Sequence, residues 1–63
     1  MEIKKELYSE KALTKAIKAF SNLCEINVTE TNAGWNLLLK KCKYDCELTE
    51  REFENYLIGL ENL

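Results

Sequence analysis

The chain has 63 residues, of which 46% are hydrophobic and 32% charged, and 11 acidic against 9 basic residues give a net charge of −2. A chain of this length buries only about 60% of its unfolded surface, so we expect one small folded domain over residues 1–63 without a deep, water-excluding active site. The charge balance gives no basic footprint for nucleic acid, and the absence of histidine removes the commonest general base and metal ligand.

The first eight residues fit a short strand better than the start of a helix. Ile3 and Leu7 share the parity of an edge strand, and Lys5 lies between them. A helix that began this early would place Ser9 in its interior. We therefore predict an edge strand that includes Ile3 to Leu7.

A helical pattern follows this strand. Apolar residues recur at positions 13, 16, 17, 20 and 24, which predicts a helix over residues 10–24. Ser9 stands where an N-cap oxygen would accept a hydrogen bond from an amide of the first turn. Tyr8 and Leu13 occupy the two positions of a hydrophobic staple around that cap.

The hydrophobic period then changes to two. Ile26 and Val28 alternate with polar residues, as in a strand with one solvated face. Residues 31–34 read Thr-Asn-Ala-Gly, a composition that tolerates a tight hairpin turn. We therefore expect a second strand here, joined by a hairpin to the next one.

The strand after the hairpin carries the strongest alternation. Trp35, Leu37 and Leu39 form its predicted inward face. Leu38 and Cys42 then fall on the opposite face, which makes that face more apolar than a solvated sheet surface requires. Such a face favours association with a partner.

The three cysteines are an odd number, so internal disulfides cannot use all of them. Cys42-x3-Cys46 has the spacing of the first two ligands of a radical SAM cluster motif, but Thr49 stands where the third cysteine would be. A tetrahedral zinc site needs four ligands, which a single chain does not supply. We expect reduced cysteines and no metal or other cofactor; a site shared between two chains is the alternative.

The last predicted element is a second helix. Thr49 and Glu52 match a capping box, and Leu48 opens a hydrophobic staple in front of it. Gly59 weakens this helix by about 1 kcal/mol relative to alanine, and Ile58 points away from its apolar stripe. Contact with a partner is one explanation of both the glycine within the helix and the outward-pointing isoleucine. The stripe consists of Phe53, Tyr56, Leu57 and Leu60.

The resulting order is β-α-β-β-α, which predicts an α+β fold. We expect a two-layer sandwich, a truncated ferredoxin-like arrangement in which two helices cover one face of a three-stranded sheet. The sheet order would be first, third, second strand. Because the fold stops before its last strand, the first strand would keep an open edge. Either this edge is short, charged and left in water, or a strand from another chain pairs with it.

The expected contact residues follow from this geometry. They are Ile3, Lys5 and Leu7 on the edge strand, together with Leu38 and Cys42 on the open face of the sheet.

Two segments resemble a known family. Tyr8-x3-Ala12-Leu13-x2-Ala16 and Phe53-x-Asn55-x-Leu57 are similar to the opening and closing helices of the small HxsD-type proteins of His-Xaa-Ser peptide-modification systems. The resemblance implies a small non-catalytic companion of radical SAM enzymes that binds or assembles with a precursor peptide or with the maturase. It assigns no catalytic residue.

The preferred hypothesis is therefore an accessory binding protein, and the alternative is a structural homo-oligomer. An enzyme is disfavoured, because no two acids outside the helices have the spacing of a catalytic carboxylate pair. The longest apolar run is Leu37–Leu39, and the N-terminus lacks the apolar core of a signal peptide. We accordingly expect a cytoplasmic protein that binds neither membranes nor nucleic acid.

Overall fold

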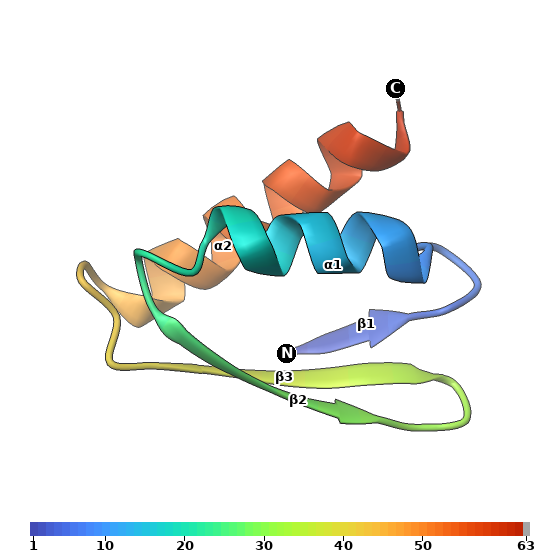
Figure 1. Ribbon diagram of the computed structural model, residues 1–63, viewed down its shortest axis with the longest axis horizontal. Coiled ribbons are helices and arrows are strands. Elements are labelled where there is room, and N and C mark those ends of the chain that lie inside the picture. Colours follow the sequence, from blue (N-terminus) through green and yellow to red (C-terminus); the bar gives the residue numbers. More distant parts are fainter. Residues whose placement is uncertain (63) are drawn as a thin grey trace.

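A computed structural model describes residues 1–62 of the chain and contains the five predicted elements in the predicted order (Figure 1). The fold is α+β, as the alternation of hydrophobic periods indicated. The elements are β1 (Glu2–Lys4), α1 (Glu10–Ala19), β2 (Glu25–Glu30), β3 (Gly34–Lys40) and α2 (Cys46–Glu61).

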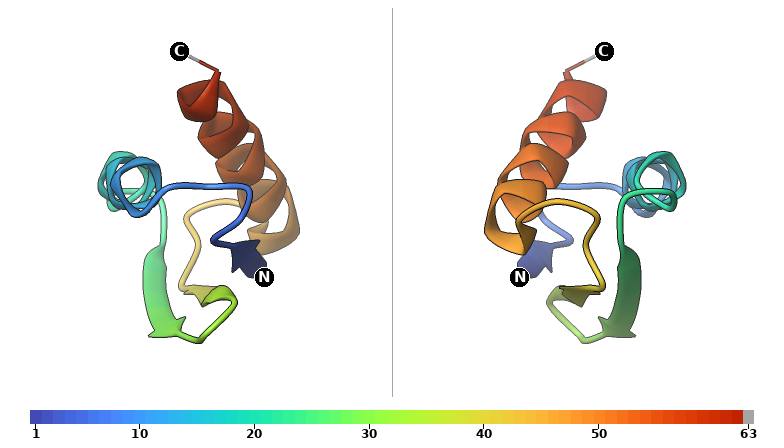
Figure 2. Two further views of the ribbon diagram at one scale, coloured as in Figure 1. Left: turned by 90° about the vertical axis from the view of Figure 1, so that its right-hand side faces the viewer. Right: turned by 90° about the vertical axis from the view of Figure 1, so that its left-hand side faces the viewer.

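The three strands form one sheet in the order β1-β3-β2, with β3 antiparallel to both neighbours. Both helices lie on the same side of this sheet (Figure 2). The arrangement is the predicted two-layer sandwich, consistent with a ferredoxin-like fold that lacks its last strand. The register places Ile3 opposite Trp35 on one side of β3, and Val28 opposite Leu37 on the other.

The core lies between the sheet and the two helices. The largest fully buried side chains are Ile3 of β1 and Phe53 and Leu57 of α2. The predicted inward face of β3 is confirmed, because Trp35, Leu37 and Leu39 are all buried. Phe20 joins the two helices through an edge-on contact with Phe53, with ring centroids 5.2 Å apart.

Helix α1 begins where the sequence predicts and ends five residues earlier. Ser9 is the N-cap, and its Oγ accepts from the Ala12 amide at 3.1 Å. The helix stops at Ala19, and in the turn that follows, the Ser21 amide and hydroxyl both donate to the Lys18 carbonyl. Cys24 is buried in the core, as the apolar pattern predicts, but it lies in the turn after the helix and not in the helix itself.

Helix α2 begins four residues before the predicted start, and the predicted capping box is wrong. Asp45 is the N-cap, with Oδ1 accepting from the Glu47 and Leu48 amides. Thr49 is buried inside the helix, where its hydroxyl donates to the Asp45 carbonyl. The staple fails with it, because Leu48 is 47% exposed. A carboxylate is at least as good an N-cap as a hydroxyl, so the helix begins after Asp45 rather than after Thr49.

Strand β1 is shorter than predicted. It ends at Lys4, whose carbonyl accepts hydrogen bonds from both the Leu7 and the Tyr8 amides. This tight turn brings the chain from the sheet to Ser9 within five residues of the strand's end. The prediction of a strand from Ile3 to Leu7 is therefore wrong beyond Lys4. The Leu7 amide donates within the turn and is not free to pair with another strand.

The open edge of β2 and its apolar groove

The outward-facing backbone groups of β2 follow from the hairpin. The Thr31 amide donates to the Gly34 carbonyl at 2.8 Å, so these two residues form a hydrogen-bonded pair. Hydrogen-bonded pairs alternate along an antiparallel ladder, so the N–H and C=O groups of Ile26, Val28 and Glu30 point away from β3. Within residues 1–62, β3 is the only strand that pairs with β2. Strand β2 thus has an open edge six residues long.

The edge of β1 is much smaller. Met1 exchanges two hydrogen bonds with Leu37, and the Lys5 amide donates to the Ala33 carbonyl, so the odd-numbered residues face β3. Within the strand only Glu2 and Lys4 present outward backbone groups, and the turn already uses the Lys4 carbonyl. Both carry charged, exposed side chains, which discourage another strand from pairing there. Of the two edges, β2 offers the longer run of backbone donors and acceptors.

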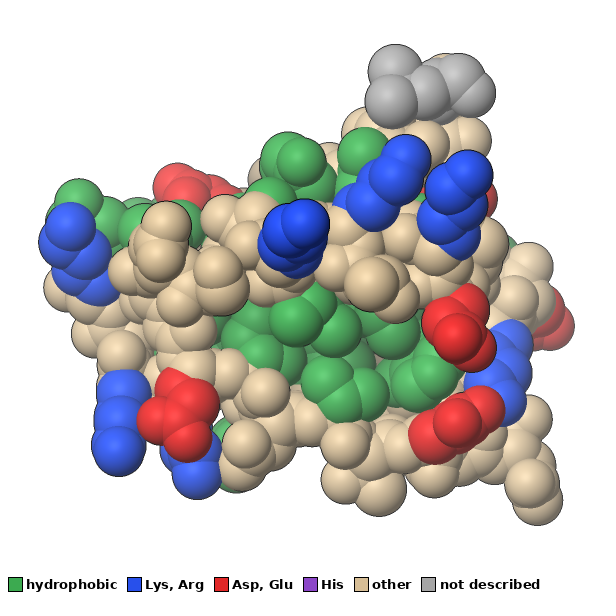
Figure 3. Space-filling view, in the orientation of Figure 1, with side chains coloured by type: hydrophobic (Ala, Val, Ile, Leu, Met, Phe, Trp, Pro, Cys, Tyr) green, Lys and Arg blue, Asp and Glu red, His purple; other side chains and the backbone are tan. Residues whose placement is uncertain are grey.

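An apolar groove accompanies the edge of β2. Ile17, Ser21 and Cys24 line it from α1 and the turn that follows, and Glu25 and Ile26 line it from β2. Val28 lies further along the same strand on the same side and is 42% exposed. Figure 3 shows this surface as hydrophobic side chains visible between α1 and β2. The predicted inward face of β2 is therefore only half covered.

The charges of β2 are compensated within the fold. Glu30 Oε2 lies 2.7 Å from Lys5 Nζ, and Glu25 lies 3.6 and 3.9 Å from the ammonium groups of Lys41 and Lys40. All five side chains are well exposed, so these pairs add little stability. They do leave the strand without net charge at its ends. Strand β2 also contains no lysine and no proline, the usual residues that block an edge.

The predicted contact residues of the first strand do not form one surface. Ile3 is 1% exposed and packs in the core, so its side chain cannot meet a partner. Lys5 follows the strand, pairs with Glu30 and lies 5.5 Å from the Trp35 ring centroid. Leu7 is 62% exposed but belongs to the turn. The predicted binding edge at Ile3 to Leu7 is thus a strand end and a turn.

The outer face of the sheet is polar, which corrects the expectation of an apolar open face. Leu38 lies there and is 59% exposed, as predicted, but it is the one hydrophobic side chain of the set. An isolated exposed leucine is ordinary on a protein surface. Register and side-chain alternation give this face Glu2, Lys4, Glu25, Asn27, Thr29, Asn36, Leu38 and Lys40.

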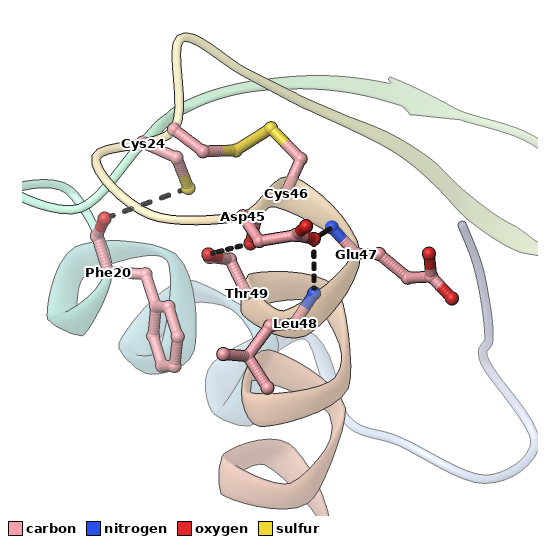
Figure 4. The surroundings of a disulfide bond; sticks show 8 residues. Phe20, Cys24, Asp45, Cys46, Glu47, Leu48 and Thr49 are labelled. Carbon is pink, nitrogen blue, oxygen red and sulfur yellow. Dashed lines mark hydrogen bonds between the residues drawn. A yellow bond between two sulfur atoms is a disulfide. The ribbon is translucent and has the colours of Figure 1, made fainter.

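Cys42, unlike Leu38, does not lie on that face. It is half-buried after the end of β3 and forms a disulfide with Cys46, so the expectation of reduced thiols is wrong for these two residues. Figure 4 shows this bond at the first turn of α2. A four-residue spacing that spans a turn brings two cysteines within bonding distance. Cys24 keeps its thiol, and burial raises its pKa.

Over the described residues, β1 and β2 each pair only with β3, so the predicted open edge of β1 is present, but sequence reasoning missed the longer open edge of β2. The available signal was the composition of residues 25–30, where an apolar alternation contains no lysine or proline. Over the described part of the chain, no three acidic or cysteine side chains are grouped so that they could hold a metal ion. None of the helices in residues 1–62 is long and apolar enough to cross a bilayer.

Comparison of the chain with models of known protein families, with curated proteins and with solved structures gave no match.

Proposed function

We propose that this chain is a non-catalytic binding module that receives an extended peptide along the open edge of β2. The observation that carries the proposal is the combination of a six-residue edge strand without lysine or proline and an apolar groove directly beside it. A peptide that adds to a sheet edge gains affinity from main-chain hydrogen bonds and specificity from pockets for alternate side chains. Both features are present at β2.

The geometry defines the peptide that fits. An added strand would lie about 4.8 Å from β2 and bond to the outward groups of Ile26, Val28 and Glu30. Its inward side chains would enter the groove beside Ile17 and Cys24, so these should be apolar. Its other side chains would continue the polar outer face and should be polar. The matching ligand is a segment of about six residues with alternating hydrophobicity.

The resemblance to HxsD-type proteins suggests the source of such a peptide. In that context the ligand is the precursor peptide of a radical SAM peptide-modification system, or an extended segment of the maturase, and the chemistry belongs to the partner enzyme. A cytoplasmic location fits this proposal. The alternative remains a homo-oligomer, in which two copies join the same β2 edges and no foreign peptide is bound.

The test is the binding of a synthetic peptide of about six residues with alternating apolar and polar side chains, measured by calorimetry with the wild-type chain and two variants. Val28→Lys puts a charge at the groove, and we expect it to weaken binding at least tenfold. Leu38→Lys is the matched control, because Leu38 on the neighbouring strand is even more accessible than Val28 (59% against 42%) but faces the outer side. Loss of binding in Leu38→Lys alone would move the site to the sheet face and refute the edge proposal.

Peptide chemistry provides a second arm. N-methylation of alternate peptide amides removes the donors that face β2, whereas methylation of the other set leaves them intact. We expect only one of the two methylated peptides to bind. Light scattering of the wild-type chain and of Val28→Lys distinguishes the alternative, since a dimer that the lysine dissociates, with no peptide binding, would support the homo-oligomer.

A further inference from the structure

We propose that Cys42–Cys46 is a reversible disulfide switch that controls the loop between β3 and α2. The two cysteines are four residues apart, and the bond closes a loop that contains only Lys43, Tyr44 and Asp45. So short a loop restricts the unfolded chain little, and the bond therefore contributes less to stability than one that spans distant segments. Its main structural effect is local.

The loop has few other attachments. The Lys43 amide donates to the Leu23 carbonyl at 2.7 Å, and Asp45 caps α2. Lys41, directly before Cys42, has a φ of 52°, in the left-handed region that a lysine rarely adopts. This turn directs Cys42 back toward the first turn of α2. When the disulfide opens, no cross-link holds the Lys41 backbone in that conformation.

The environment of the bond favours exchange with external thiols. Both cysteines are half-buried rather than enclosed, so a small thiol can reach them. Cys46 is the first residue of α2, and the amino end of a helix stabilises a thiolate. The Asp45 carboxylate shares this helix end and already accepts two of its amides. We take Cys42 as the attacked sulfur and Cys46 as the leaving one, because the departing thiolate then lies at the amino end of α2.

The exchange uses two molecules of a monothiol such as glutathione. The first thiolate attacks Cys42 Sγ, breaks the disulfide and forms a mixed disulfide, and Cys46 leaves as a thiolate. The second thiolate attacks the glutathione sulfur of the mixed disulfide and releases the Cys42 thiolate. Each protein thiolate takes a proton from solvent. The protein gains two electrons and two protons, and two glutathione molecules become one glutathione disulfide.

The consequence of reduction lies in a second apolar surface, which we call the Tyr44 patch. Leu23, Tyr44 and Leu48 line a depression there, together with Thr49 and Glu52. Tyr44 is 62% exposed and Leu48 47% exposed. Tyr44 lies between the two bonded cysteines, so the disulfide fixes one wall of the patch. Reduction releases that wall and changes the patch.

The test is a redox titration of the Cys24→Ser variant in glutathione buffers that run from strongly reducing to strongly oxidising. Alkylation and mass spectrometry give the fraction of the bond that is closed. We expect a change from open to closed within the series. A bond that stays closed, or stays open, in every mixture overturns the proposal.

Hydrogen exchange of the same variant supplies the structural readout. After reduction, we expect the Lys43 amide to exchange at least tenfold faster, while the α1 amides keep their protection. The variant Cys24→Ser/Cys42→Ser/Cys46→Ser should match the reduced state in every buffer. An unchanged Lys43 amide would show that the bond controls nothing. Loss of protection throughout the chain would make the bond a structural staple, which also overturns the switch.

Discussion

Ser9 and Glu61 are 52 residues apart, and they meet where the start of α1 adjoins the end of α2. Glu61 Oε1 accepts from the Ser9 amide at 2.8 Å and from the Ser9 hydroxyl at 3.0 Å. The same hydroxyl oxygen accepts from the Ala12 amide as the N-cap of α1. One serine therefore caps its own helix and ties it to the last turn of the other.

Replacing Ser9 tests this double role. Ser9→Ala removes the cap and one of the two bonds to Glu61, and we expect it to lower the free energy of unfolding by about 1 kcal/mol. Ser21→Ala is the control, because its hydroxyl bonds only within the exposed end of α1 and should change stability by less than about 0.5 kcal/mol. Urea unfolding followed by circular dichroism measures both. Equal effects of the two substitutions would contradict a special role for Ser9.

The two glycines provide a matched pair with opposite expectations. A Cβ on Gly34 would come within 2.0 Å of the Ile3 carbonyl oxygen, so Gly34→Ala must push β1 away from β3. A Cβ on Gly59 meets no atom within 4 Å, so Gly59→Ala should stabilise α2 by up to about 1 kcal/mol.

Thermal unfolding separates these effects, and hydrogen exchange of the Leu37 amide, which donates to Met1, reports on β1 directly. We expect faster exchange at Leu37 in Gly34→Ala and none of this change in Gly59→Ala. A Gly34→Ala variant with wild-type exchange at Leu37 would mean that the close approach of β1 and β3 is not as described.

Phe53 and Tyr56 show how burial decides the effect of losing a ring. Both rings contact Phe20 edge-on, at 5.2 and 5.7 Å between centroids, but Phe53 is fully buried and Tyr56 is 43% exposed. Phe53→Ala should cost about 3–5 kcal/mol, most of the roughly 3–9 kcal/mol expected for a chain of this size. Tyr56→Ala should cost about 1 kcal/mol, mainly the aromatic contact. Far-ultraviolet circular dichroism shows whether Phe53→Ala folds; a well-folded variant would contradict the assigned core.

Cys24 gives the chain a stability change at high pH. Burial raises the pKa of its thiol above the ordinary 9.0, so the unfolded chain loses this proton at a lower pH than the folded chain does. The stability that the neutral thiol contributes is complete below about pH 9 and is lost as the pH rises through the folded-state pKa. The difference in unfolding free energy between wild type and Cys24→Ala should therefore shrink as the pH rises from about 9 to about 11. A difference that is constant over this range would contradict the buried thiol.

The fold could be predicted because its signals are local. The spacing of Leu13, Ala16 and Phe20 defines one face of a helix, and the alternation of Trp35, Leu37 and Leu39 defines one face of a strand. Each face has to be buried, and a sheet with two helices on one side buries both kinds. The N-cap at Ser9 is equally local, and the structure confirms it.

The helix boundaries were harder, because several residues near each end can serve as caps. Asp45 and Thr49 both have the chemistry of an N-cap, and only the position of the turn after β3 favours Asp45. The partner of Ser9 could not be predicted either. Glu61 follows no motif with it, and the two meet only because α1 and α2 pack against each other.

The amino-acid sequence by itself determined the class of fold, the order of the strands and the inward face of β3, since periodicity and chain connectivity suffice for these. The tertiary structure alone decided that Ile3 is core, that the longer open edge belongs to β2, and that Cys42 bonds Cys46. These properties depend on which surfaces the two helices cover and on where the loops turn. The first two follow from packing between segments distant in the chain, and the third follows from the way the loop after β3 turns, which the four-residue spacing of the cysteines does not fix by itself.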